Sequence, residues 1–127
     1  MQAYLLVFLG AGIGGCLRHT ANLLAARLLG TGFPWGTFLI NITGSLVMGL
    51  MAGLLAFRSG ANWTQHARLF LLTGVLGGYT TFSAFSLDTA LLVERSELGL
   101  AAAYVGGSVA LALAAVFGGL AIARGLT

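Results

Sequence analysis

Long apolar segments alternate with short polar links along the 127 residues of this chain. The apolar segments predict helices over residues 4–29, 35–57, 68–92 and 98–122. A helix needs about 20 residues to cross the hydrocarbon core of a bilayer, and each segment reaches that length. We therefore expect an all-α membrane protein with four transmembrane helices. Residues 1–127 then form a single transmembrane domain, because the four crossings leave no room for a soluble one.

The third segment carries an interruption that the other segments lack. Residues 77–80 are four successive weak helix formers, Gly-Gly-Tyr-Thr, and each Gly costs a helix interior about 1 kcal/mol relative to Ala. Broken helices at membrane depth are surrounded by protein or water, and their freed backbone groups often hold ions. The pattern predicts a third helix that is broken in mid-membrane. The alternative is an unbroken helix with a Gly-rich packing face and two core rings, Phe82 and Phe85.

Composition agrees with a membrane protein. The chain is 58% hydrophobic and only 7% charged, whereas soluble domains are about 25% charged. Most of the surface must therefore face lipid. The six basic residues are all Arg and are dispersed along the chain, so no basic patch indicates a nucleic-acid partner. The single cysteine, Cys16, excludes an intrachain disulfide.

Arginines near the helix ends bear on orientation. With four crossings, Arg58, Arg68 and Arg124 lie on one side of the membrane, and Arg27 and Arg95 lie on the other. Three against two is a weak positive-inside bias. A chain with so little bias can insert in both orientations. We therefore predict an antiparallel dual-topology homodimer, because a two-fold dimer is the simplest closed assembly.

Two of the polar residues inside apolar segments, Arg18 and Asn41, are candidates for a functional role. A charge in a span normally faces a cavity or a partner, so Arg18 either lines an aqueous vestibule that attracts anions, or snorkels to the interface or pairs with Asp88. Asn41 in the second segment either makes an interhelical hydrogen bond, worth about 1 kcal/mol, or lines a pore as a donor to an anion. The residues alone leave both alternatives open.

Small residues recur at intervals of four and predict faces where helices approach closely. They form four sets: Gly10 with Gly14, Gly12 with Cys16, Ser45 with Gly49 and Gly53, and Gly99 with Ala103 and Gly107.

Three stretches resemble the motifs of one known family, the Fluc (CrcB) fluoride channels. Residues 77–86 read GGYTTFSAFS and look like the third-helix signature of that family. Residues 35–45, WGTFLINITGS, resemble its second-helix motif, and residues 10–18, GAGIGGCLR, resemble its first-helix motif. The three motifs occur in the family's order, and the resemblance spans nearly the whole chain.

The resemblance implies a dual-topology antiparallel homodimer with two fluoride pores and a central structural Na⁺. By position, backbone carbonyls of Gly77 and Thr80 would hold the ion, and carbonyl oxygens suit a hard cation. The side chains of Asn41, Phe82 and Phe85 would line the fluoride pathway, because the edge of a phenyl ring is positive. The resemblance further implies polar-track or vestibule positions at Arg18, Ser83, Tyr104 and Ser108. One departure is Ala112, which leaves the track without a hydroxyl one turn beyond Ser108.

The function implied is a fluoride-selective channel, not an enzyme, in a bacterial inner membrane, with fluoride, lipid and a second copy of the chain as partners. HF enters cells as a neutral molecule and dissociates inside, so fluoride would leave passively. The alternative is a small dual-topology proton-coupled multidrug transporter, which needs a carboxylate in mid-membrane. The first two segments contain no acidic residue, and Asp88 lies late in the third. A non-conducting packing subunit of a larger complex is a third possibility.

Overall fold

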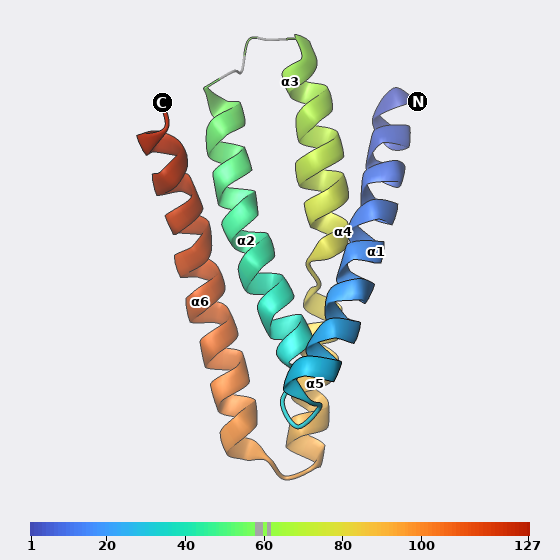
Figure 1. Ribbon diagram of the computed structural model, residues 1–127, viewed down its shortest axis with the longest axis vertical. Coiled ribbons are helices and arrows are strands. Elements are labelled where there is room, and N and C mark those ends of the chain that lie inside the picture. The colour runs from blue at the N-terminus through green and yellow to red at the C-terminus, as the bar shows by residue number, and fades with distance from the viewer. Residues whose placement is uncertain (58–59, 61) are drawn as a thin grey trace.

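The computed structural model describes residues 1–57, 60 and 62–127, and in this part of the chain all regular structure is helical (Figure 1). The elements are α1 (Gln2–Leu29), α2 (Trp35–Ala56), α3 (Asn62–Ala67), the π-helix η1 (Arg68–Leu76), α4 (Gly77–Tyr79), α5 (Phe82–Glu94) and α6 (Leu98–Gly125). α3, η1 and α4 follow one another without an intervening loop.

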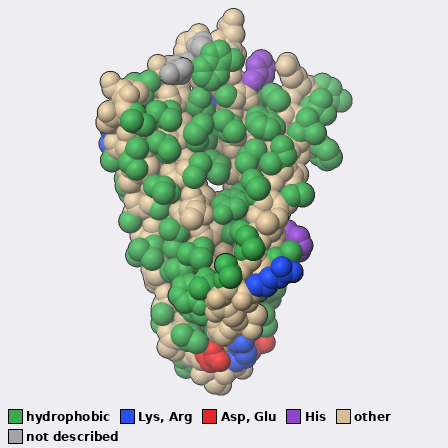
Figure 2. Space-filling model, viewed as in Figure 1, with side chains coloured by type: hydrophobic (Ala, Val, Ile, Leu, Met, Phe, Trp, Pro, Cys, Tyr) green, Lys and Arg blue, Asp and Glu red, His purple; other side chains and the backbone are tan. Residues whose placement is uncertain are grey.

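Three helical runs among the described residues are long and apolar enough to cross a bilayer. They are Trp35–Ala56, the 33-residue run Asn62–Glu94, and Leu98–Gly125. The 28-residue helix α1 lies beside them and packs on η1 and α4. Large apolar side chains point outward over much of the surface (Figure 2), as lipid contact requires. The chain is therefore an all-α, multi-pass membrane protein.

The helices are arranged in two closely packed pairs. α2 runs along α6, and α1 runs along η1 and α4. Both chain termini and the link between α2 and α3 lie at one end of the molecule, and the other two links lie at the opposite end (Figure 1). Arg58, one of the residues used to weigh orientation, lies outside the described residues.

Glycines allow the backbones of α2 and α6 to touch. A side chain at Gly49 would collide with the carbonyl oxygen of Val116, and one at Gly119 would collide with the backbone of Leu46 and Leu50. Gly53 in turn faces the Cβ of Ala123. The close approach predicted from Gly49 and Gly53 is therefore confirmed.

The first helix uses glycine in the same way. A Cβ at Gly10 would lie 2.9 Å from the Cα of Gly74, and one at Gly14 would lie 2.8 Å from the backbone nitrogen of Tyr79. By contrast, a Cβ at Gly12 would meet nothing within 4 Å, and Cys16 is exposed. Of the two expected faces of α1, the one formed by Gly10 and Gly14 is thus the face that packs within the chain.

Helical backbone stops between α4 and α5. Thr80 has φ −80° and ψ 157°, and Thr81 has φ −153° and ψ 121°, so both residues are extended. The weak helix formers had placed this interruption earlier, at residues 77–80. Gly77 and Gly78 stay helical, and α1 packs against the second of them: a Cβ at Gly78 would lie 2.9 Å from the Cα of Ala11. The helix ends instead at the pair of β-branched threonines.

Two buried clusters stabilise the chain internally. One consists of Leu55, Leu72 and Leu76, where α2 meets η1. The other consists of Leu92, Ala101 and Tyr104, with Phe33, Phe38 and Phe85 packed against it. The second cluster fixes α5 on α6, so it positions the segment that follows the interruption.

Candidate functional site

A groove of about 380 Å³ lies between α2, α5 and α6, next to the extended segment Thr80–Thr81. Its polar and aromatic lining includes Asn41, Thr80, Thr81, Phe82, Phe85 and Ser108. The groove therefore brings together the three residues expected to line an anion pathway, Asn41, Phe82 and Phe85, with the threonine pair and one expected polar-track serine.

Asn41 binds the peptide backbone at the interruption. Its Nδ2 donates to the carbonyl oxygen of Thr81 at 3.0 Å, and the N–H of Thr81 donates to its Oδ1 at 2.9 Å. The interhelical hydrogen bond offered by the sequence is therefore confirmed. A primary amide carries two N–H donors, so one Nδ2 hydrogen of Asn41 remains for a ligand. The pore-lining alternative thus stays open beside the structural one.

The rings of Phe82 and Phe85 lie together on one face of α5. Their centroids are 5.5 Å apart and their planes meet at 45°. Phe85 also packs on the ring of Tyr104, with the centroids 5.1 Å apart. Phe82 is 78% exposed in the single chain. Phe85 therefore has a core contact as well as a groove position, whereas Phe82 has little internal packing.

Ser108 places an unpaired hydroxyl at the groove. Its side chain is 6% exposed, and its Oγ has no hydrogen-bond partner among the described residues. A buried hydroxyl without a partner costs about 1–3 kcal/mol. A ligand that accepts a hydrogen bond would remove that cost. Ser83, by comparison, is exposed and lies 3.3 Å from the Oγ1 of Thr81.

Tyr104 lies outside the groove lining. Its side chain is fully buried, and its hydroxyl donates to Oδ2 of Asp88 at 3.1 Å. The tyrosine thus joins α6 to α5 and does not continue the line from Ser108 along the groove.

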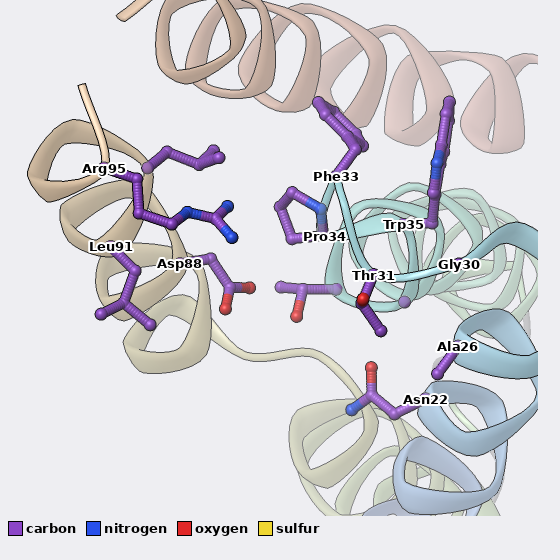
Figure 3. A pocket seen from close by; sticks show the side chains of 13 residues that line it. Asn22, Ala26, Gly30, Thr31, Phe33, Pro34, Trp35, Asp88, Leu91 and Arg95 are labelled. Atoms are coloured by element: carbon purple, nitrogen blue, oxygen red, sulfur yellow. The ribbon is translucent and has the colours of Figure 1, made fainter. Parts of the chain in front are cut away.

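A second cavity, of about 340 Å³, opens near the link between α1 and α2 (Figure 3). Asn22, Thr31 and Asp88 bring polar side chains to it. Arg95 also lines it and lies 3.7 Å from the carboxylate of Glu97. This cavity holds both signs of charge, whereas the groove beside Asn41 holds neither.

Arg18 on α1 belongs to neither the groove nor the second cavity. Within the described residues it forms no ion pair, so the alternative that paired it with Asp88 is wrong. It lines neither of the two cavities, although Asn22, one turn further along α1, lines the second. The interfacial and vestibule alternatives remain for Arg18.

The carbonyls of Gly77 and Thr80 fit the requirements of a hard cation. In a continuous helix they would accept the N–H groups of Thr81 and Ala84. Here those two amides donate to side chains, Asn41 Oδ1 at 2.9 Å and Thr81 Oγ1 at 3.1 Å. Among the described residues there is also no cluster of three His, Cys, Asp or Glu. Backbone oxygens are ligands that hard cations accept.

Sequence reasoning missed how α2 and the interrupted segment are joined. Besides the Asn41 pair, the Oγ1 of Thr43 lies 3.0 Å from the hydroxyl of Tyr79. Asn41 and Thr43 are two residues apart, as are Tyr79 and Thr81. This matched spacing of polar residues in two apolar segments could have predicted that the two segments are joined by hydrogen bonds.

Comparison with known proteins identifies the family of this chain. The family model described as "CrcB-like protein, Camphor Resistance (CrcB)" matches residues 5–120, which include both cavities and the extended segment. The chain belongs to the CrcB family. The resemblance of the three sequence motifs is thereby confirmed.

Curated members of the CrcB family are similar over the full chain. Fluoride-specific ion channel FluC of Rhodopseudomonas palustris (strain BisB5) is 64% identical over 126 residues, covering 99% of this chain and 100% of that protein. Fluoride-specific ion channel FluC 2 of Nitrobacter hamburgensis is 64% identical over 124 residues, covering 98% of each. The FluC protein of Beijerinckia indica is 55% identical over 127 residues, covering 100% of each. These CrcB relatives are named as ion channels, in agreement with the prediction that the chain is not an enzyme.

Proposed function

We propose that this protein is a fluoride-selective channel of a bacterial inner membrane and that it lets fluoride leave the cytoplasm passively. The observation that carries the proposal is the buried, unpaired hydroxyl of Ser108 at a groove shared with Asn41 and the two phenyl rings. The relatives named as fluoride-specific ion channels support the same ion.

The groove offers an anion weak attractions at several points. Asn41 has one free N–H, Ser108 has a free O–H, and Phe82 and Phe85 present ring edges, which are positive. A pore conducts when each site is favourable enough for entry and weak enough for exit. No full positive charge lines this groove, so no single site traps the anion.

The working assembly is an antiparallel dual-topology homodimer in which α1 supplies a fourth crossing. Phe82 is 78% exposed in a single chain, and Gly77 is exposed too. A second copy would cover both. Among the described arginines near helix ends, which do not include Arg18, the pair Arg27 and Arg95 belongs to one end of the bundle and the pair Arg68 and Arg124 to the other. Such a balance supports insertion in both orientations.

A structural Na⁺ belongs at the centre of this dimer. The carbonyls of Gly77 and Thr80 from both copies would bind it, because their helical donors are engaged elsewhere. The bound cation would raise the local positive potential and so favour anions in the neighbouring grooves. The ion is structural and takes no part in a chemical step.

Fluoride export is driven by the dissociation of HF and does not require coupling to proton transport. HF crosses the bilayer as a neutral molecule, dissociates in the more alkaline cytoplasm and leaves fluoride behind. The channel then lets fluoride run down its electrochemical gradient. A proton-coupled transporter would need a free carboxylate at its centre, whereas Asp88 lies in the second cavity and accepts a hydrogen bond from Tyr104.

The test is anion efflux from liposomes that contain the purified protein. We expect rapid fluoride release once charge movement is balanced by a potassium ionophore, with chloride released at least tenfold more slowly. Equal release of both anions, or no fluoride release from protein that elutes as a folded dimer, would overturn the proposal. Proton-driven uptake of a lipophilic cation by the same liposomes would favour the transporter.

A further inference from the structure

The interruption after α4 redirects two particular amide protons. In an α-helix the N–H of each residue donates to the carbonyl four residues earlier, which would pair Thr81 with Gly77 and Ala84 with Thr80. The N–H of Thr81 instead donates to Asn41 Oδ1 at 2.9 Å, and the N–H of Ala84 donates to Thr81 Oγ1 at 3.1 Å. The two carbonyls that lose these donors are those of Gly77 and Thr80.

We propose that the side chains of Asn41 and Thr81 create the cation site by holding these two amide protons away from the carbonyls of Gly77 and Thr80. Neither side chain touches the ion. Each is a positioning residue that acts through a backbone amide. This inference rests on the proposed sodium site and adds the reason why its oxygens are available.

Both amides have acceptors within the chain, so their hydrogen bonds do not require the ion. Buried backbone N–H groups seek a partner, and Thr81 is only 9% exposed. If Asn41 offered no acceptor, the helical alternative for the Thr81 amide would be the carbonyl of Gly77. Phe82 and Ser83 also follow the interruption, and their helical acceptors would lie before it. In the described part of the chain, the amides of these two residues have no side-chain acceptor. Gly77 and Thr80 are thus the carbonyls whose helical donors are held elsewhere.

The second bond of Asn41 fixes the direction of this peptide. Its Nδ2 donates to the carbonyl of Thr81 at 3.0 Å while its Oδ1 accepts from the N–H of the same residue. Thr81 therefore keeps φ near −153° and ψ near 121°, which is extended and unsuited to a helical hydrogen bond. One amide side chain on α2 thus holds both polar groups of the residue that follows the ion-binding carbonyl of Thr80.

The experiment measures Na⁺ binding and not flux. The thermal midpoint of the purified protein in detergent is followed while NaCl replaces N-methylglucamine chloride. We expect Na⁺ to raise the midpoint of the wild type, as any ligand of the folded state does. Asn41→Leu and Thr81→Val remove the acceptor atoms at similar volume. Each should raise the half-saturating Na⁺ concentration about tenfold, the equivalent of one hydrogen bond.

Thr81→Ser is the matched control, because it keeps the hydroxyl that caps α5 and should keep Na⁺ affinity within about twofold. A wild type with no response to Na⁺ would overturn the sodium site itself. Wild-type Na⁺ affinity in both Asn41→Leu and Thr81→Val would overturn this inference alone, with the sodium site intact.

Amide hydrogen exchange in the wild type gives a second test that needs no variant. The amides of Thr81 and Ala84 should exchange slowly in Na⁺-free buffer, because their acceptors are side chains and not groups ordered by the ion. If they exchange rapidly without Na⁺ and become protected only when Na⁺ is added, the ion orders the segment and the inference fails.

Discussion

Tyr104 and Asp88 lie 16 residues apart in the chain and are joined by a 3.1 Å hydrogen bond between the phenolic hydroxyl and Oδ2. The tyrosine is fully buried, and the bond fastens α5 to α6 beyond the interruption. Polar and ionisable groups within a span are costly and normally find a partner. The bond supplies that partner and accounts for a carboxylate inside an otherwise apolar protein.

Removing the hydroxyl should therefore weaken the fold. We expect Tyr104→Phe to lower the free energy of unfolding by about 1–3 kcal/mol, because Asp88 loses its donor while the ring packing is kept. Unfolding in mixed micelles, followed by circular dichroism, measures the change. Tyr4→Phe is the control, since Tyr4 is 81% exposed and should change stability by less than about 0.5 kcal/mol. Equal effects of the two substitutions would contradict a stabilising bond.

Phe82 offers the cleanest test of ring electrostatics. We expect Phe82→Ile to cut fluoride efflux at least about tenfold, because the variant loses the positive ring edge. Its side chain is 78% exposed in the single chain, so the fold of the protomer should be unaffected, and size-exclusion elution checks that the dimer still forms. Phe117→Leu, a 68% exposed residue outside the groove lining, is the control and should conduct normally. Normal efflux through Phe82→Ile would show that this ring only packs and does not attract the anion.

Phe85 should combine two effects. Phe85→Leu is expected to reduce fluoride efflux for the same electrostatic reason. It should also cost about 1 kcal/mol of stability, because its ring packs on Tyr104 with centroids 5.1 Å apart. Efflux per folded dimer, with folding checked by size-exclusion chromatography, separates the two. A variant that loses stability but keeps full efflux would show that Phe85 is only a core residue.

Asn41→Asp should block fluoride while keeping an acceptor for the Thr81 amide. An ionised carboxylate repels the anion, and the substitution also removes the N–H donors. We expect fluoride efflux to fall at least about tenfold. The Na⁺ dependence of thermal stability should change far less than in Asn41→Leu. Unimpaired efflux through well-behaved Asn41→Asp dimers would remove Asn41 from the pathway.

Positive charge added at one end of the bundle or at the other tests the assembly. Asn62→Lys with Gln65→Lys adds positive charge at one end, and Gly32→Lys with Gly99→Lys adds it at the other, all at exposed positions. Each pair should fix one orientation by the positive-inside rule and abolish fluoride resistance in cells that lack their own channel. Co-expression of the two variants should restore resistance. Full resistance from either variant alone would exclude an obligate antiparallel dimer.

The sequence predicted much of the helical framework because hydropathy and residue spacing are local properties. Gly10, Gly14, Gly49 and Gly53 were identified as packing positions from their intervals, and each abuts a neighbouring helix. The interval of four also marked Gly12 and Gly99, where an added Cβ would meet no described residue within 4 Å. Spacing shows that a face permits close approach, but it does not show which neighbour uses it.

The position of the interruption was harder to predict because helix propensity competes with packing. Gly77 and Gly78 are poor helix formers, yet both are helical, and α1 approaches Gly78 so closely that only a residue without a side chain fits there. The pairing of Asn41 with Thr81, 40 residues away, depends on the tertiary fold. So does the bond between Tyr104 and Asp88. Local residue patterns do not show which residues of distant segments meet, apart from the matched spacing of Asn41 and Thr43 with Tyr79 and Thr81.

The backbone contacts of Gly49 and Gly119 have a mechanical consequence. With no side chains between them, α2 and α6 have almost no freedom to slide or rotate against each other. We expect the two helices to move as one rigid body that carries Asn41 and Ser108 at a constant separation. Asn41 in turn holds both polar backbone groups of Thr81, so the extended segment should travel with this rigid body.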